Sequence, residues 1–220
     1  ITSIATAGLV TVINFKADKF DVKGQLAKYT ETKSESDKTN KDLYNLASTT
    51  IRNSITYNAV GQMTSYKEDQ TKDGQTISTI RKDITYTSLG FIKSYTDTIQ
   101  QNSAADLFTE VKFTAARYDT YGRLAAYTEQ KTESDLTNNI YNVLTTTIRS
   151  GITYNKMGQM AGYLEATAKF DKDNNPVSAE LKTQRKDIIY TALGFVSSYQ
   201  DTITSIATAG LVTVINFKAD

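Results

Sequence analysis

Residues 1–18 and residues 203–220 share one sequence, ITSIATAGLVTVINFKAD, identical at all eighteen positions and offset by 202 residues. A fixed internal period is the signature of repeat architectures, in which each unit packs only on its neighbours. We therefore expect residues 1–202 to form one full period, residues 203–220 to begin the next, and no separate domains. The chain is then a window on a longer array. The alternative is a self-contained domain with a duplicated terminal strand.

A shorter motif recurs six times inside this period: an aromatic residue, three residues, glycine, four residues and tyrosine. Successive motif glycines are 29 to 37 residues apart, and the second copy of residues 1–18 continues this series in phase. The in-phase continuation favours the open array. The copies are Phe20-Gly24-Tyr29, Tyr57-Gly61-Tyr66, Tyr86-Gly90-Tyr95, Tyr118-Gly122-Tyr127, Tyr154-Gly158-Tyr163 and Tyr190-Gly194-Tyr199.

Each motif predicts a β-hairpin. Before the glycine, apolar and polar residues alternate along the chain. This period of two predicts a strand with Ile51, Ile55 and Tyr57 on one face and Thr50, Arg52, Ser54 and Thr56 on the other. Asp or Asn then opens a type I turn, replaced by Thr at 87 and 191, and glycine supplies the left-handed residue. We expect strands to end at each aromatic residue, to restart after each glycine, and Gly61, Gly122 and Gly158 to have positive φ.

The second strand of the hairpin leaves one question open. Met63 and Tyr66 are three residues apart, so a regular strand places them on opposite faces. Either a β-bulge shifts the register, or both faces of the sheet are partly covered.

The far ends of the hairpins are predicted to turn at polar loops of variable length. These loops are 35–42, 72–74, 100–106, 133–139, 172–176 and 208–210. With about twelve strands per period, the fold class is all-β: tandem antiparallel β-hairpin repeats forming a spiralling sheet, a tube or a solenoid. One closed turn per period would make a narrow tube filled with side chains, and a wider spiral would leave a cavity.

A second level of order groups three motifs into a super-repeat that occurs twice per period. Five residues before the motif aromatic stand Arg52, Arg81, Arg149 and Arg185, replaced by Phe15 and Phe113 in the remaining copies. An acid always follows two residues after the second tyrosine: Glu31, Glu68, Asp97, Glu129, Glu165 and Asp201. Because these groups recur with the array, we interpret them as a cross-strand charge ladder, with Glu68, Asp97, Glu165 and Asp201 facing the four arginines, rather than as catalytic pairs.

Composition excludes several function classes. The chain has no His and no Cys, which removes histidine-based catalysis, thiolate chemistry and disulfides. A net charge of +1 gives no field directed at nucleic acid, and no apolar run approaches the length of a membrane span. We predict no enzyme activity, no cofactor and no metal, since the acidic loops lack calcium-loop spacing. The tyrosines could stack on carbohydrate, but packing between repeats is the favoured interpretation.

The segment Tyr118-Asp119-Thr120-Tyr121-Gly122-Arg123-Leu124 resembles the YD repeat of the Rhs, Tc-toxin and teneurin families, whose core is Tyr-Asp-x-x-Gly-Arg-Leu. The other five copies depart from it, with Asn or Thr for Asp and Gln or Phe for Arg. The resemblance implies a spiralling antiparallel sheet that forms a hollow extracellular shell or a surface stalk.

The expected function is therefore that of a structural segment in a long extracellular or cell-surface protein that forms a fibre or tube. The expected partners are further copies of the same repeat, from the same or neighbouring chains. Two alternatives remain: a YD-repeat shell enclosing a toxin, and a stalk or binding module of an adhesin.

Overall fold

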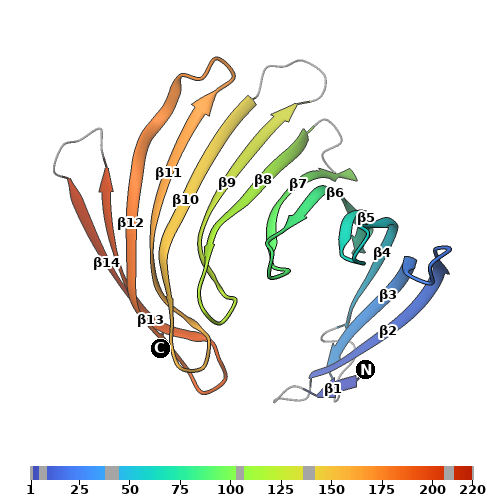
Figure 1. Cartoon of the computed structure of the whole chain (residues 1–220). Helices are drawn as coiled ribbons and strands as arrows, with labels where there is room; N and C mark the ends of the chain where they lie inside the picture. Colours follow the sequence, from blue (N-terminus) through green and yellow to red (C-terminus); the bar gives the residue numbers. More distant parts are fainter. Residues whose placement is uncertain are drawn as a thin grey trace. The chain divides into compact units, whose positions relative to one another are not determined.

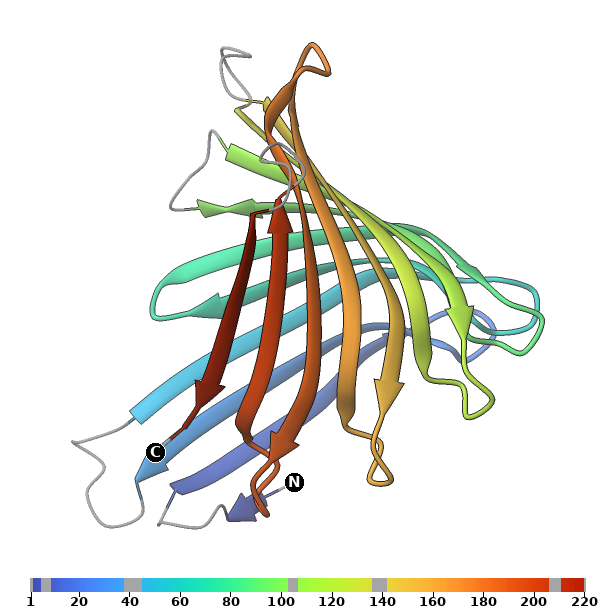
Figure 2. The same cartoon turned by 90° about the vertical axis from the view of Figure 1, so that its left-hand side faces the viewer.

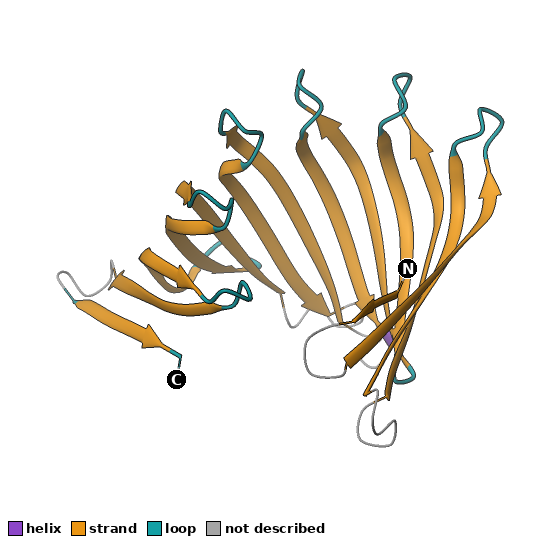
Figure 3. Ribbon diagram, turned by 90° about the horizontal axis from the view of Figure 1, so that it is seen from below, coloured by secondary structure: helices purple, strands orange, loops and turns teal. Residues whose placement is uncertain are grey.

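The computed structural model describes residues 2–4, 9–37, 45–102, 107–135, 142–205 and 211–219. In these residues fourteen strands follow one another in chain order in the sheet, and each neighbouring pair whose register the structure describes is antiparallel. The all-β hairpin fold predicted from the sequence is thereby confirmed. Almost every described residue outside the turns lies in a strand (Figure 3).

The strands are β1 (Thr2–Ile4), β2 (Leu9–Phe20), β3 (Leu26–Asp37), β4 (Asn45–Tyr57), β5 (Met63–Lys72), β6 (Gln75–Tyr86), β7 (Ile92–Gln101), β8 (Leu107–Tyr118), β9 (Leu124–Asp135), β10 (Asn142–Tyr154), β11 (Met160–Asp171), β12 (Pro176–Tyr190), β13 (Val196–Ser205) and β14 (Val212–Lys218). Every motif ends one strand at its aromatic residue and begins the next two residues after its glycine, as predicted. The twelve strands β2–β13 form the period, and β14 repeats β2.

Contacts group the chain into two compact units. Unit 1 comprises residues 1–85 and 95–109, and unit 2 comprises residues 86–94 and 110–220. In unit 1, β2 to β5 run side by side, and in unit 2, β9 to β14 do the same (Figures 1 and 2).

The motif turns share one hydrogen-bonding pattern. In the turn after β4, Asn58 Oδ1 accepts from the amides of Val60 (3.1 Å) and Gln62 (2.9 Å), and the Gly61 amide donates to the Asn58 carbonyl at 3.1 Å. Asp21, Asp119 and Asn155 make the same bonds, whereas Thr87 and Thr191 accept only one, through Oγ1. The side chain of the first turn residue thus fixes each turn.

The motif glycines adopt the left-handed conformation. The φ angles are +84° at Gly61, +77° at Gly122 and +80° at Gly158, which confirms the prediction. A type I turn followed by a left-handed residue is the common three-residue hairpin connection, and a residue with Cβ is disfavoured there.

The predicted far-end loops are shorter than expected where they are described. At residues 72–75 the loop is a two-residue turn, with Asp73 and Gly74 both at positive φ, as in a type I′ hairpin. β3, β7 and β9 extend to Asp37, Gln101 and Asp135, into the predicted loops. Apart from Asn102, the remaining parts of those loops, and all of residues 208–210, lie outside the described residues.

Two compensating bulges flank the motif turn between β4 and β5. On β4 and β5, Asn53 pairs with Lys67 and Thr56 with Ser65, so one extra residue lies in β4. Tyr57 then pairs with Met63, which places one extra residue, Thr64, in β5. The same shifts recur between β10 and β11 and between β12 and β13. A left-handed residue marks the first bulge: Ser54 (φ 53°), Asp83 (56°), Gly151 (58°) and Asp187 (56°).

The first bulge overturns the predicted division of faces. Lys67 and Ser65 share a face of β5, so their partners Asn53 and Thr56 share a face of β4 although they are three residues apart. Arg52, Ile55 and Tyr57 therefore lie together, and Ile51 lies opposite. The prediction that Arg52 faces away from Ile55 and Tyr57 was wrong, because the extra residue at Ser54 reverses the alternation.

The second bulge answers the question left open by the sequence. Because Thr64 is the extra residue, Met63 and Tyr66 lie on the same face of β5. The bulge alternative is confirmed.

Neighbouring hairpins keep one register although their spacing in the sequence varies. Between hairpins, the motif tyrosine pairs with the residue nine positions before the next glycine: Tyr29 with Arg52, Tyr66 with Arg81, Tyr127 with Arg149 and Tyr163 with Arg185. Tyr199 pairs in the same way with Phe217, the equivalent of Phe15. Within hairpins, that residue pairs with the acid two positions after the tyrosine: Phe15 with Glu31, Arg52 with Glu68, Arg149 with Glu165 and Arg185 with Asp201. Each hairpin is therefore displaced from the previous one by two residues, about 7 Å along the strand.

The two copies of the repeated segment agree in strand assignment but differ at one register. Residues 10–16 and 212–218 are both strand. Thr2 pairs with Val12, whereas its equivalent Thr204 pairs with Val212, two positions from the equivalent of Val12. β14 follows the general rule because Tyr199 aligns it with Phe217.

Few side chains of either unit are buried. Among the described residues, the buried hydrophobic side chains are Ile55, Ile84, Ala125 and Ile152, and no large side chain is fully buried. Contacts between neighbouring strands, rather than a core between two layers, therefore stabilise the fold.

Candidate functional site

The most ordered side-chain arrangement is a row of alternating tyrosine and arginine on the face that carries Arg52 and Tyr66. We call this row the ladder and its side of the sheet the ladder face. In unit 1 the ladder consists of Phe15, Tyr29, Arg52, Tyr66, Arg81 and Tyr95. In unit 2 it consists of Phe113, Tyr127, Arg149, Tyr163, Arg185, Tyr199 and Phe217.

The guanidinium groups lie over tyrosine rings on both sides. Arg52 is 4.1 Å from the Tyr66 centroid and 5.5 Å from that of Tyr29. Arg81 lies 3.7 Å from the Tyr95 centroid and 5.7 Å from that of Tyr66. These distances are within the range of cation–π attraction, about 0.5–2 kcal/mol each. At the super-repeat boundaries phenylalanine takes the arginine's place, with ring centroids 5.1 Å apart for Phe15 and Tyr29.

Each ladder arginine is also held by the carboxylate of its own hairpin. Arg81 donates through Nε and Nη2 to the two oxygens of Asp97, at 2.7 and 2.6 Å, and Arg185 does the same with Asp201. Arg52 and Arg149 instead donate both bonds to one oxygen, Oε2 of Glu68 and of Glu165. The structure thus brings together all four predicted pairs.

Burial distinguishes the two kinds of pair. The side chains of Asp97 and Asp201 are 9% and 8% exposed, against 23% and 21% for Glu68 and Glu165. The shorter, buried aspartates make the fork-to-fork geometry, which is the strongest arrangement of these two groups.

The ladder shifts the ionisation of its members. Hydrogen bonds with Asp97 raise the pKa of Arg81 above its ordinary value although burial acts in the opposite direction, and Asp201 has the same effect on Arg185. Burial raises the pKa of the Tyr66 phenol, while Arg81 and Arg52 lower it. Burial likewise raises the pKa of Tyr29, Tyr127 and Tyr163.

These tyrosines predict a loss of stability at alkaline pH. Because the pKa of these tyrosines is higher in the folded state, the unfolded chain releases its phenolic protons at a lower pH than the folded chain does. The contribution of the tyrosines to the free energy of unfolding is therefore complete below about pH 10 and is lost as the pH rises through their folded-state pKa values. We expect the free energy of unfolding from urea denaturation to be flat between about pH 8 and pH 9 and to fall above about pH 10. Phenolate absorbance should rise together with unfolding. Normal tyrosine titration in a chain that stays folded would contradict this prediction.

A second set of contacts joins the hairpins near their turns. The first tyrosine of a motif donates its hydroxyl to the carbonyl of the residue two positions after the preceding motif glycine. Tyr57 donates to Leu26 (2.8 Å), Tyr154 to Leu124 (2.7 Å), Tyr190 to Met160 (2.8 Å), and Tyr118 to Ile92. Phe20 lacks this hydroxyl.

At two motif turns, the residue after the glycine contacts the next hairpin. Phe91 stacks on Tyr118 with centroids 5.0 Å apart, and Arg123 lies 4.4 Å from the Tyr154 centroid. Arg123 also pairs with Asp119 of its own turn at 2.7 Å. The YD-like copy thus uses its Asp in the turn and its Arg both in the turn and against the next repeat.

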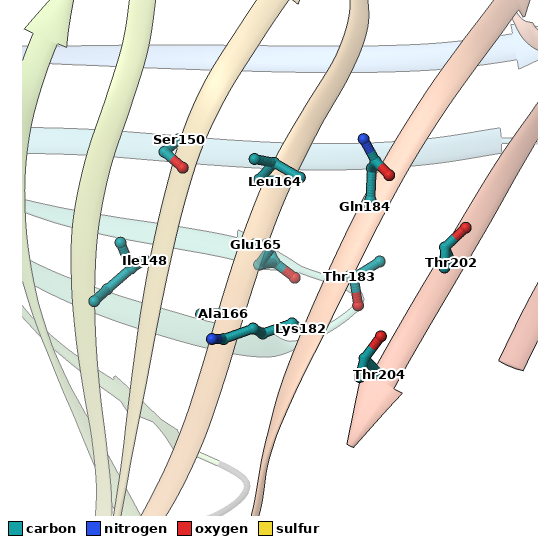
Figure 4. A pocket seen from close by; sticks show the side chains of 10 residues that line it. All are labelled: Ile148, Ser150, Leu164, Glu165, Ala166, Lys182, Thr183, Gln184, Thr202 and Thr204. Atoms are coloured by element: carbon teal, nitrogen blue, oxygen red, sulfur yellow. The ribbon is translucent and has the colours of Figure 1, made fainter. Parts of the chain in front are cut away.

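The opposite face of unit 2 carries a hollow of about 310 Å³. Eight of its lining residues form two cross-strand rows on β10 to β13: Ser150, Leu164, Gln184 and Thr202, and Ile148, Ala166, Lys182 and Thr204. Figure 4 shows the ten lining residues spread over four neighbouring strands. The rows bring together no acid–base pair, since Lys182 is their one ionisable residue.

Two absences concern the described part of the chain. It contains no group of three or more acidic side chains placed to hold a metal ion. It also contains no helix with the length and hydropathy needed to cross a membrane.

Sequence reasoning found the ladder's members but not their stacking. The signal lay in two constant offsets, arginine nine residues before a glycine and tyrosine five residues after the previous one. A second signal was the residue two positions after each arginine. It is Ser54, Asp83, Gly151 or Asp187, and Gly and Asp in particular tolerate the left-handed conformation of a bulge.

The chain matches no known protein-family model, and no curated protein shows significant sequence similarity to it. The case for function therefore rests on the repeat and its geometry.

Proposed function

We propose that the chain is a structural repeat segment of a long extracellular or cell-surface protein that forms a fibre or tube. In such an array each hairpin stabilises its neighbour, and the ladder is the element that passes from one repeat to the next. On this proposal the carboxylate–arginine pairs are structural and the chain is not an enzyme.

One observation carries the proposal. Phe217, the equivalent of Phe15 one period later, stacks on Tyr199 with centroids 4.9 Å apart and pairs with it in the register that Tyr29, Tyr66, Tyr127 and Tyr163 use with the following hairpin. The boundary between periods is therefore built like the boundaries within one. An array with this property grows by nearest-neighbour contacts and has no preferred length.

Three further observations support this proposal. Tyr29, Tyr66, Tyr127, Tyr163 and Tyr199 each lie between two ladder neighbours, so their ring faces are occupied rather than presented to a sugar. The Arg–carboxylate pairs recur instead of differentiating into one site. The resemblance of residues 118–124 to the YD repeat supports an extracellular or surface location.

The proposal is tested with concatenated periods. Chains of one, two and three copies of residues 1–202, each ending in residues 203–220, should show equal increments of contour length in electron micrographs. Circular dichroism per residue should stay constant, and the thermal midpoint should rise towards a plateau.

The matched control carries a flexible Gly/Ser linker of about 20 residues at each junction, which separates the periods without removing any residue. Its thermal midpoint should equal that of the single period. Concatemers whose length does not grow, or whose stability matches the linker control, would refute a continuous array.

A further inference from the structure

The residue before the motif glycine is a large apolar residue at the tip of its turn in five of the six motifs. The sixth motif, Asp21-Val22-Lys23-Gly24, carries its valine one position earlier. We call these five the tip residues, and all are highly exposed: Val60 79%, Leu89 80%, Tyr121 81%, Met157 77% and Leu193 70%. Single exposed apolar residues are common on proteins, but here they recur with the repeat. Burial in the fold does not explain why this position stays apolar.

In unit 2 the tip residues follow one another along one end of the sheet. The turns that join β8 to β9, β10 to β11 and β12 to β13 all lie at this end (Figures 1 and 2). Neighbouring hairpins are offset by two strands across the sheet and by two residues along it, so Tyr121, Met157 and Leu193 stand about 12 Å apart. At this spacing the side chains do not cover one another, and each presents its apolar surface separately.

The backbone of the tip is already hydrogen-bonded within its own turn. The Tyr121 amide donates to Asp119 Oδ1 and the Met157 amide to Asn155 Oδ1, both at 2.9 Å. The amide of Gly158 donates to the Asn155 carbonyl at 3.0 Å. Because these donors have partners, the tip loses less when it leaves water than an open turn would.

The surroundings of the turns are basic. The residues within five positions of the six motif turns include ten of the 25 Lys and Arg but only five of the 24 Asp and Glu. Two of these acids are paired, Asp18 with Lys16 and Asp119 with Arg123. The turn end of the hairpins is therefore positive although the whole chain is nearly neutral, and it complements an anionic surface.

The tip position keeps its apolar character but not its shape, since it holds valine, leucine, tyrosine or methionine. A protein partner would select one shape, because the cores of protein interfaces pack as densely as protein interiors. The boundary between lipid headgroups and acyl chains instead accepts any apolar side chain, and basic residues beside it attract anionic headgroups. Spacing, variability and charge together favour a lipid surface.

We propose that the motif turns of unit 2 form an edge that docks on an anionic lipid bilayer. The tip residues enter the headgroup region, and the exposed Lys93, Lys156 and Lys186 lie beside the lipid phosphates. The contact is peripheral, because one side chain per turn enters the bilayer. The inference goes beyond the proposed array and does not depend on it, since unit 2 alone presents four tip residues.

Tryptophan fluorescence of the full 220-residue chain tests the docking, because the chain contains no tryptophan. Leu89→Trp, Met157→Trp and Leu193→Trp each place a reporter at a tip. Vesicles of phosphatidylcholine with about 30% phosphatidylserine should shift each emission spectrum to the blue. Brominated lipids should quench that emission by about half or more.

Val177→Trp is the matched control. Val177 is 56% exposed and lies in β12 beside the turn at the opposite end of the hairpin, so its spectrum should not change with vesicles. Equal shifts at position 177 and at the tips would overturn the proposal, because the chain would then adhere without orientation. A shift at the tips that grows with chain concentration in the absence of vesicles would overturn it too, since the tips would then bind a second copy.

Two triple variants separate the apolar and the electrostatic parts of the contact. Leu89→Ser/Met157→Ser/Leu193→Ser should lower vesicle affinity in a sedimentation assay by about tenfold or more, with an unchanged circular dichroism spectrum. Lys93→Gln/Lys156→Gln/Lys186→Gln should weaken binding by a similar factor at low salt, and less at high salt. A serine variant that sediments with vesicles like the unchanged chain would overturn the proposal.

The outcome is separable from the test of the proposed function. Concatemers that extend while vesicle binding fails leave the array standing and remove the docking edge. Vesicle binding by chains whose concatemers do not extend removes the array and leaves the docking edge.

Discussion

Replacing Arg81 by alanine is expected to lower the free energy of unfolding by about 2–4 kcal/mol. The substitution removes two hydrogen bonds to Asp97 and the contacts with Tyr66 and Tyr95. It also leaves the Asp97 carboxylate, whose side chain is 9% exposed, without its cation. Urea denaturation followed by circular dichroism measures the change.

The pair formed by Arg52 and Glu68 provides the control. The Glu68 side chain is 23% exposed, so water solvates the orphaned carboxylate and Arg52→Ala should cost about half as much. The double variant Arg81→Ala/Asp97→Ala should recover part of the loss, because no buried charge remains. Equal effects of the two single arginine substitutions, or strictly additive effects of Arg81→Ala and Asp97→Ala, would show that the buried pair contributes no coupling.

Gly122→Ala is expected to cost about 2–3 kcal/mol, more than alanine at the other motif glycines. The φ of Gly122 is +77°, and an added Cβ would lie 2.4 Å from Cζ of Phe91. Phe91 cannot withdraw freely, because its ring stacks on Tyr118. The new methyl group must therefore disturb both the turn and the contact between hairpins. Thermal and urea unfolding of the variant measure the cost.

Gly158→Ala separates the two contributions. Gly158 has a φ of +80°, and no heavy atom lies within 4 Å of an added Cβ. Gly158→Ala should therefore cost only the penalty for a residue with Cβ in the left-handed conformation, about 1 kcal/mol. The double variant Gly122→Ala/Phe91→Ala should remove the steric part of the penalty at Gly122. If Gly122→Ala and Gly158→Ala destabilise the chain equally, Phe91 does not restrict the turn.

The sequence was sufficient to locate the hairpins, because their signals are local. Asn58 bonds backbone amides two and four residues ahead, and Gly61 takes a conformation that other residues avoid. Such interactions need no distant partner, so the strand ends at Tyr57, Tyr118 and Tyr154 could be predicted. The 202-residue repeat is equally a property of the sequence.

The tertiary structure alone decided which side chains share a face. A bulge inserts one residue without altering composition. Strict alternation along the strand placed Arg52 and Ile55 on opposite faces, whereas the bulge at the left-handed Ser54 brings both side chains to the same face. Ser54 is a weaker local signal of the bulge than Asp83, Gly151 or Asp187 at the equivalent positions, so the arrangement of residues 50–57 is decided by pairing with β5.

The ladder was hidden from the sequence for a related reason. Tyr66 and Arg81 are 15 residues apart, whereas Tyr29 and Arg52 are 23 apart, yet both pairs lie directly opposite each other. The loops at the far ends of the hairpins differ in length and accommodate this difference. The number of residues between two positions therefore does not determine whether they pair. Register is set instead by the Arg–carboxylate pair within a hairpin and the Tyr–Arg stack between hairpins, and these contacts exist only once the strands have come together.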